Sequence, residues 1–135
     1  MYSGWLKFNG EEHENTLRSA TNYARYFTSL GRFEEARSLL RKTLPVARRV
    51  TRDTSDISIR MRTLYAQSLF FDAAATLDDL REAVATLEEL ARTARRVLGG
   101  AHPMAVHVDD TLRRARAVLR AREAGMRVVF DTSST

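Results

Sequence analysis

The chain repeats part of its own sequence at a spacing of 42 to 47 residues. The tetrapeptide Ala-Arg-Arg-Val at residues 47–50 returns at residues 94–97, and Tyr23-Ala24 returns as Tyr65-Ala66. Self-similarity at such a period is typical of proteins in which similar helical units stack side by side. Stacked units present an extended surface, and such surfaces usually bind partners. The repetition therefore favours a binding protein over an enzyme.

Composition sets outer limits on this prediction. A chain of 135 residues that is 44% hydrophobic can bury the core of one domain or a short repeat array. No cysteine is present, so disulfides and thiolate metal sites are excluded, and a reducing compartment such as the cytoplasm is expected. No apolar run approaches the roughly 20 residues of a membrane-spanning helix, and no signal peptide is recognised.

The charge of the chain is basic and is carried almost entirely by arginine. The formal net charge is +5, and all but Lys7 and Lys42 of the 22 basic residues are arginines. A basic surface attracts acidic partners and speeds the encounter with them. A GC-rich coding genome would explain the preference for arginine equally well, so arginine content alone does not identify a site.

Apolar residues recur at spacings of three and four, which predicts five helices. We expect one hairpin over residues 15–51, a second over residues 56–98 and a single helix over residues 103–124. Gly31 should end the first helix, and Pro103 suits the first turn of the last one. Ser55 and Thr76 are expected to cap helices, Thr76 through a capping box with Asp79.

The residues of the first hairpin and of one later loop share a known pattern. The hairpin carries Tyr23, Ala24, Phe27, Gly31, Phe33, Ala36, Leu40 and Leu44 at characteristic positions, and residues 98–103 read Leu-Gly-Gly-Ala-His-Pro. The chain thereby resembles the tetratricopeptide repeat, in particular the longer variety of kinesin light chains. The resemblance implies an all-α fold: a right-handed α-solenoid of about two hairpins with a C-terminal capping helix. Tyr23, Phe27, Phe33 and Tyr65 are then expected in its core.

This resemblance divides the chain into three parts. Residues 10–124 form the repeat domain, and Gly10 to His13 match the inter-repeat loop in part. Residues 1–9 are expected to be the remnant of a preceding helix, because Trp5 to Phe8 align with residues 47–50. Residues 125–135 are expected to be a tail.

Neither catalysis nor metal binding is indicated by the polar residues. His13 and His102 occupy equivalent loop positions, where a hydrogen bond to a neighbouring helix is the expected role, and no pair of carboxylates lies at a zinc-ligand spacing with these two residues or with His107. Adjacent acidic residues on a helix point about 100° apart and do not converge as an acid–base pair. We therefore expect no catalytic residue, no metal and no cofactor.

A groove is the sharpest functional hypothesis. In tetratricopeptide arrays the first helix of each hairpin lines the concave side, and the resemblance carries ten polar residues onto that side. Arginine forks bind carboxylates, and amide side chains bond to peptide backbones. The predicted ligand is an extended acidic peptide of another protein, with Asp110 the one carboxylate nearby. The ten residues are Arg18, Thr21, Asn22, Arg25, Arg60, Thr63, Gln67, His107, Thr111 and Arg114.

Three alternatives remain open at this point. The arginine clusters at residues 48–52, 92–96 and 113–116 could bind nucleic acid or another acidic surface. The chain could be a structural repeat fragment that forms homo-oligomers through its open edge, with Trp5 and Phe8 as a docking patch. The ten groove residues could also be ordinary polar residues that face solvent.

Overall fold

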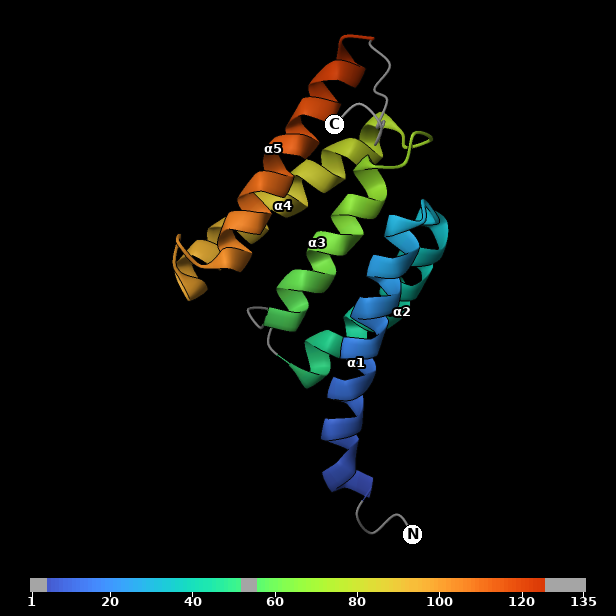
Figure 1. The fold of residues 1–135 in the computed structure, drawn as a ribbon, viewed down its shortest axis with the longest axis vertical. Helices are drawn as coiled ribbons and strands as arrows, with labels where there is room; N and C mark the ends of the chain where they lie inside the picture. Colours follow the sequence, from blue (N-terminus) through green and yellow to red (C-terminus); the bar gives the residue numbers. More distant parts are fainter. Residues whose placement is uncertain (1–4, 52–55, 126–135) are drawn as a thin grey trace.

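The computed structural model describes residues 5–51 and 56–125, with side chains from residue 15 onward, and this part of the chain contains five α-helices and no strand (Figure 1). The all-helical prediction is confirmed. Ser55, Arg52 and residues 126–135 lie outside the described residues. The helices are α1 (Trp5–Ser29), α2 (Phe33–Val50), α3 (Asp56–Phe70), α4 (Leu77–Leu98) and α5 (Pro103–Glu123).

Helix α1 is longer than the sequence pattern suggested. It is continuous from Trp5 through residues 10–13, so the loop expected there was wrong, and residues 5–9 belong to α1 and not to a separate helix. The residue that follows the Gly-x-x-His motif explains why the helix continues. At residues 98–103 the motif ends in Pro103, which removes a backbone donor and favours a helix start. Glu14 occupies the corresponding place in α1, so nothing interrupts the helix.

The helices pack as two hairpins and a fifth helix, in sequence order. Helix α1 packs on α2, α3 packs on α4, and α5 packs on α4. Helix α3 also contacts α1 and α2 of the first hairpin, and α5 contacts α3. Each odd-numbered helix after the first therefore lies against the preceding hairpin, as in a stacked helical repeat (Figure 1).

Helix α3 is the centre of the molecule. Ten of its 15 residues are buried, on all sides of the helix, because α1, α2, α4 and α5 all contact it. Ile57, Met61 and Leu64 join the core of the first hairpin, whereas Ile59 and Phe70 join the core shared by α4 and α5. Tyr65 packs against both cores and links them.

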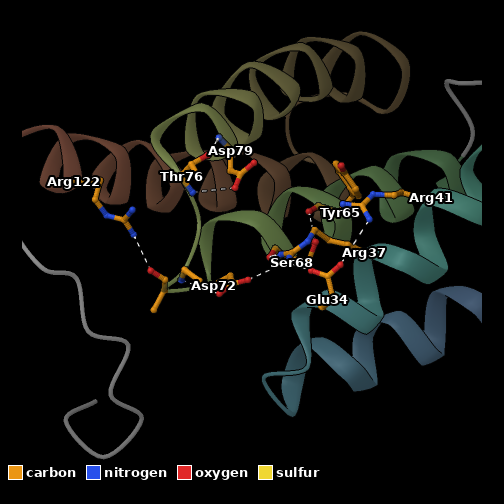
Figure 2. Close-up of polar contacts among 11 residues, drawn as sticks. Glu34, Arg37, Arg41, Tyr65, Ser68, Asp72, Thr76, Asp79 and Arg122 are labelled. Carbon is orange, nitrogen blue, oxygen red and sulfur yellow. Dashed lines mark hydrogen bonds and ion pairs between the residues drawn. The ribbon is translucent and has the colours of Figure 1, made fainter.

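Local chemistry explains where several helices begin and end. Gly31 adopts a φ of 77°, and the amides of Gly31 and Arg32 bond back to Thr28 and Phe27, which closes α1 in a Schellman motif. The predicted capping box is confirmed: Thr76 accepts from the Asp79 amide at 3.1 Å, and Asp79 accepts from the Thr76 amide at 3.0 Å (Figure 2).

The role expected for His102, a hydrogen bond from the loop to a neighbouring helix, is confirmed. Its Nδ1 accepts a hydrogen bond from the amide of Met104 at 3.0 Å, so the imidazole caps α5, the helix that follows it. The first turn of any helix leaves backbone N–H groups without a partner in the helix. The imidazole of His102 lies next to the first turn of α5 and accepts from one of these groups. The side chain of His13, the equivalent residue, is not described.

Two arginines hold the loop between α3 and α4 from opposite sides (Figure 2). Arg37 of α2 donates to the carbonyl of Ser68 at the end of α3 and to Asp72 Oδ2 at 3.0 Å. Arg122 of α5 donates to the carbonyls of Ala75 and Ala73. This loop carries the residues by which the second hairpin exceeds the first, and the two side chains fix it to the first hairpin and to the last helix.

Tyr23 contradicts the expectation of a core position. Its side chain is 61% exposed on α1, although its repeat partner Tyr65 is half-buried on α3. Both tyrosines stand in a Thr-x-Tyr-Ala segment, but within the described residues only Tyr65 packs against a preceding hairpin. Among the described residues, no helix combines the length and apolarity needed to cross a membrane.

Candidate functional site

Helices α1, α3 and α5 share one side of the molecule, and an open cleft lies between them. The cleft has a volume of about 460 Å³. Its walls bring together a residue of α1, several residues of α3 and the start of α5. They are Arg25, Arg60, Thr63, Leu64, Gln67, His102, Pro103, Met104 and His107.

A second, smaller hollow of about 150 Å³ lies between α1 and α3. Arg60 lines both hollows, so they are neighbours along α3. Arg18, Thr21 and Asn22 of α1 line the smaller one together with Ile57 and Asp56. Eight of the ten sequence-predicted groove residues thus line the two hollows, and Thr111 and Arg114 line neither.

The three threonines of the predicted set are not the exposed groove positions that were expected. Thr21, Thr63 and Thr111 are between 2% and 4% exposed; Thr21 and Thr63 occupy equivalent positions of the repeat, and Thr111 lies one residue further along α5. Each hydroxyl donates to the carbonyl four residues earlier, Leu17, Ile59 and His107, at 2.7, 2.7 and 2.8 Å. A short side chain whose hydroxyl bonds to its own helix can be buried at little cost. The threonines therefore form the floor of the surface, and their hydroxyl protons are already donated.

Charge around the cleft is predominantly positive. His107 on α5 lies in the field of Arg25 from α1, Arg60 from α3 and Arg114 from α5. Partial desolvation of the imidazole lowers its pKa below the ordinary value of 6.5, and the three guanidinium groups lower it further. The nearby carboxylate of Asp110 opposes this shift without cancelling it. The neutral imidazole of His107 is therefore favoured over the charged form more strongly than in a free histidine.

Two carboxylates temper the positive charge. Asp110 accepts from Arg113 at 2.9 Å and lies 3.5 Å from Nε of Arg114, and the hydrogen bond from Arg113 lowers the pKa of Asp110. Asp56 lies 3.7 Å from Arg60 at the rim of the smaller hollow. All three ion pairs are substantially exposed, so each contributes little to stability and a competing carboxylate can replace Asp56 or Asp110.

Sequence reasoning missed several of the residues that line the hollows. Asp56 opens α3, and its position one turn before Arg60 is a signal that the spacing of four residues contained. Pro103 and Met104 enter the cleft because the start of α5 lies against α3, which local sequence does not reveal. With Leu64 they give the cleft an apolar wall beneath a cationic rim.

Several arginines of α4 and α5 form ion pairs between the two helices. Arg95 bonds to Asp109 at 3.0 Å, and Arg116 bonds to Glu88 at 2.9 Å. The arginine-rich clusters at residues 92–96 and 113–116 therefore carry less net charge than a count of arginines suggests. Within residues 56–125 and the described side chains of α1 and α2, no three His, Asp or Glu residues converge as metal ligands.

Comparisons with known proteins agree with this geometry. Residues 2–49 match the family model of the tetratricopeptide repeat, a match that covers nearly all of the first hairpin. Neither the curated proteins nor the solved structures gave a significant match. The match supports a tetratricopeptide repeat protein, and such repeats generally mediate protein–protein interaction and are typically noncatalytic. The kinesin light chain variety stays a prediction.

Proposed function

We propose that the chain is a noncatalytic interaction module that binds an extended acidic segment of another protein along α1, α3 and α5. The observation that carries this proposal is the cleft whose rim holds Arg25, Arg60 and His107. These residues come from three different helices, so a segment that crosses the array would meet each in turn. Arginine binds carboxylates through a planar fork of donors, which gives orientation as well as attraction.

Other features of the surface support an extended ligand. Gln67 lies in the same cleft, and an amide side chain can both donate to and accept from a peptide backbone. The smaller hollow continues along α3 toward Arg18 and Asn22. A preformed surface of this kind loses little entropy when it binds, and its charge steers an acidic partner toward it.

Protonation of His107 would couple to this binding. A carboxylate that enters the cleft favours the charged imidazolium and raises the pKa of His107 from its lowered value in the unbound protein. Binding then takes up a proton, so affinity for an acidic peptide rises as the pH falls below the ordinary histidine value of 6.5. Asn in place of His107 would abolish the dependence.

The test is a titration with a fluorescently labelled acidic peptide and a peptide of the same length in which amides replace the carboxylates. The variant Arg25→Glu with Arg60→Glu should bind the acidic peptide at least about tenfold more weakly, since each tenfold change corresponds to about 1.4 kcal/mol. The matched control, Arg92→Glu with Arg96→Glu, changes net charge equally on exposed positions of α4 and should retain affinity. Equal weakening in both variants, or equal binding of both peptides, rejects the groove.

Nucleic acid binding is the alternative outcome of that test. It predicts that the α4 variant loses affinity and that affinity falls steeply with salt. The ion pairs of Arg95 and Arg116 with Asp109 and Glu88 argue against it, because they neutralise part of the arginine-rich faces.

Three finer features complete the proposal. The loop at residues 98–103 supports the kinesin light chain variety of the repeat. Right-handed stacking of the hairpins is proposed by analogy with that variety. A cytoplasmic location is proposed because a chain without cysteine fits a reducing compartment.

A further inference from the structure

Six positions on the odd-numbered helices are buried wherever a preceding hairpin is present. On α3 they are Ile57, Ser58, Met61, Leu64, Tyr65 and Ser68; five are at most 9% exposed and Tyr65 is half-buried. On α5 the repeat partners, 47 residues later, are Met104, Ala105, Val108, Thr111, Leu112 and Ala115, and all six are at most 9% exposed. These positions form the surface by which a helix packs on the hairpin before it.

The same six positions on α1 are all exposed. We call them the α1 stripe: Asn15, Thr16, Ser19, Asn22, Tyr23 and Tyr26, which precede their α3 partners by 42 residues. Tyr23 and Tyr26 are 61% and 57% exposed, more than the other large hydrophobic residues described as exposed. Ser19, Asn22, Tyr23 and Tyr26 surround a hollow of about 430 Å³. A surface that elsewhere in the chain receives helices is therefore uncovered here.

The residue composition of the α1 stripe differs from that of an ordinary solvent-exposed surface. The stripe contains no formally charged residue, although 29% of the chain is charged and the net charge is +5. Two copies of a neutral stripe can approach without the like-charge repulsion that other faces of this chain would produce. Tyrosine is enriched at protein interfaces because it buries a large ring and keeps a hydroxyl for a hydrogen bond.

We propose that a second copy of this chain covers the α1 stripe with its own α1 stripe, in a two-fold symmetric dimer. Tyrosine rings of one copy would occupy the hollow of the other, and the serine and asparagine side chains would bond to the tyrosine hydroxyls. A two-fold contact uses the same patch on both copies and closes the assembly at two.

Head-to-tail stacking fits the structure less well. It would place the α1 stripe against the outer side of α5, where Arg113, Arg116 and Arg120 are exposed. The stripe positions of α3 and α5 pack on a preceding hairpin, whereas the last described element is the single helix α5, so that end offers no such hairpin surface to the stripe. The stripe shares Asn22 with the smaller hollow of the proposed groove, but Arg25, Arg60 and His107 lie outside the stripe, so the dimer and the peptide groove are tested by different variants.

Sedimentation velocity on the full chain tests the dimer over about 5 to 500 µM, a range in which micromolar affinities are visible. The wild type should shift from monomer to dimer and go no further. Tyr23→Glu with Tyr26→Glu should stay monomeric, because four buried carboxylates would face one another. The matched control, Val97→Glu with Val106→Glu, alters side chains that are 45% and 51% exposed on α4 and α5 and should still dimerise. A wild type that stays monomeric, assembly beyond a dimer, or dissociation in the control overturns the proposal.

A second measurement uses the absence of native cysteine. In a two-fold contact the residues nearest the axis face their own copies. At least one of Ser19→Cys, Asn22→Cys and Tyr26→Cys should therefore form a disulfide-linked dimer under mild oxidation, whereas Ser38→Cys on exposed α2 should not. Equal cross-linking of all four, or of none, contradicts a two-fold contact through the α1 stripe.

Discussion

Arg37 should contribute more to the free energy of unfolding than an exposed arginine of the same helix, such as Arg41. Its side chain is 10% exposed and joins three elements: it donates to the Ser68 carbonyl, to Asp72 Oδ2 at 3.0 Å and to Glu34 Oε2 at 2.9 Å. Burial alone would lower its pKa, but the hydrogen bonds to Glu34 and Asp72 outweigh burial and raise it. The guanidinium is therefore charged at every pH at which the protein folds.

The magnitude follows from the exposure of its partners. Glu34 is 78% exposed, so its ion pair contributes about 0.5 kcal/mol or less. Asp72 is 22% exposed and Ser68 provides a carbonyl at the end of α3 that has no partner within the helix, so these charge-assisted bonds contribute about 1.5 kcal/mol or more together. Asp72 can be rehydrated when the arginine is removed, which limits the total. We expect Arg37→Met to lower the free energy of unfolding by about 2–3 kcal/mol.

Urea denaturation followed by far-ultraviolet circular dichroism measures this loss. Methionine keeps an apolar stem and removes the charge and the donors, so packing and polar effects are separated. The control is Arg41→Met on the same helix, where a 55% exposed side chain lies 4.0 Å from Glu34, and its effect should be below about 0.5 kcal/mol. Equal losses in the two variants would refute the view that Arg37 joins the first hairpin to the α3–α4 loop.

Three further predictions concern single side chains. Thr76→Ala removes the capping box of α4 and should cost about 1 kcal/mol in the same denaturation experiment, and an unchanged stability would contradict it. Asp56→Asn removes the carboxylate that competes for Arg60, so the acidic peptide should bind about two- to threefold more tightly; unchanged binding would show that Asp56 does not compete. The pKa of His107 is lowered chiefly by desolvation, so the unfolded state binds a proton more readily than the folded state does. Stability therefore falls as the pH drops below 6.5, and this fall should be smaller in His107→Asn. An identical pH profile of stability in the variant would contradict this.

Features fixed by neighbours in sequence were predictable. Gly31, Pro103 and the pair Thr76 and Asp79 act on the helix end nearest to them, and the structure has these ends where the residues indicate. The break expected at residues 10–13 failed for the same local reason, since the motif there lacks the proline that ends the motif at Pro103.

Features that depend on residues far away in the sequence could not be predicted from the sequence. Tyr23 and Tyr65 share the pattern Thr-x-Tyr-Ala, yet among the described residues only Tyr65 packs against a preceding hairpin. Arg37 is buried because its partners come from a loop more than 30 residues away. The threonines of the candidate groove were predicted as exposed because their polarity was read without the hydrogen bond to their own helix. Arg25 and Arg60 of the cleft could be predicted from the sequence, because long, charged side chains on a repeating helix face remain at the surface in each repeat.

The most direct test of the basic groove is a nuclear magnetic resonance titration of the isotopically labelled full chain with an acidic peptide. The groove predicts saturable changes in the signals of Arg25, Arg60, Gln67 and His107, together with a rise in the pKa of His107. Changes confined to α4, or changes that scatter over the surface without saturation, would contradict it.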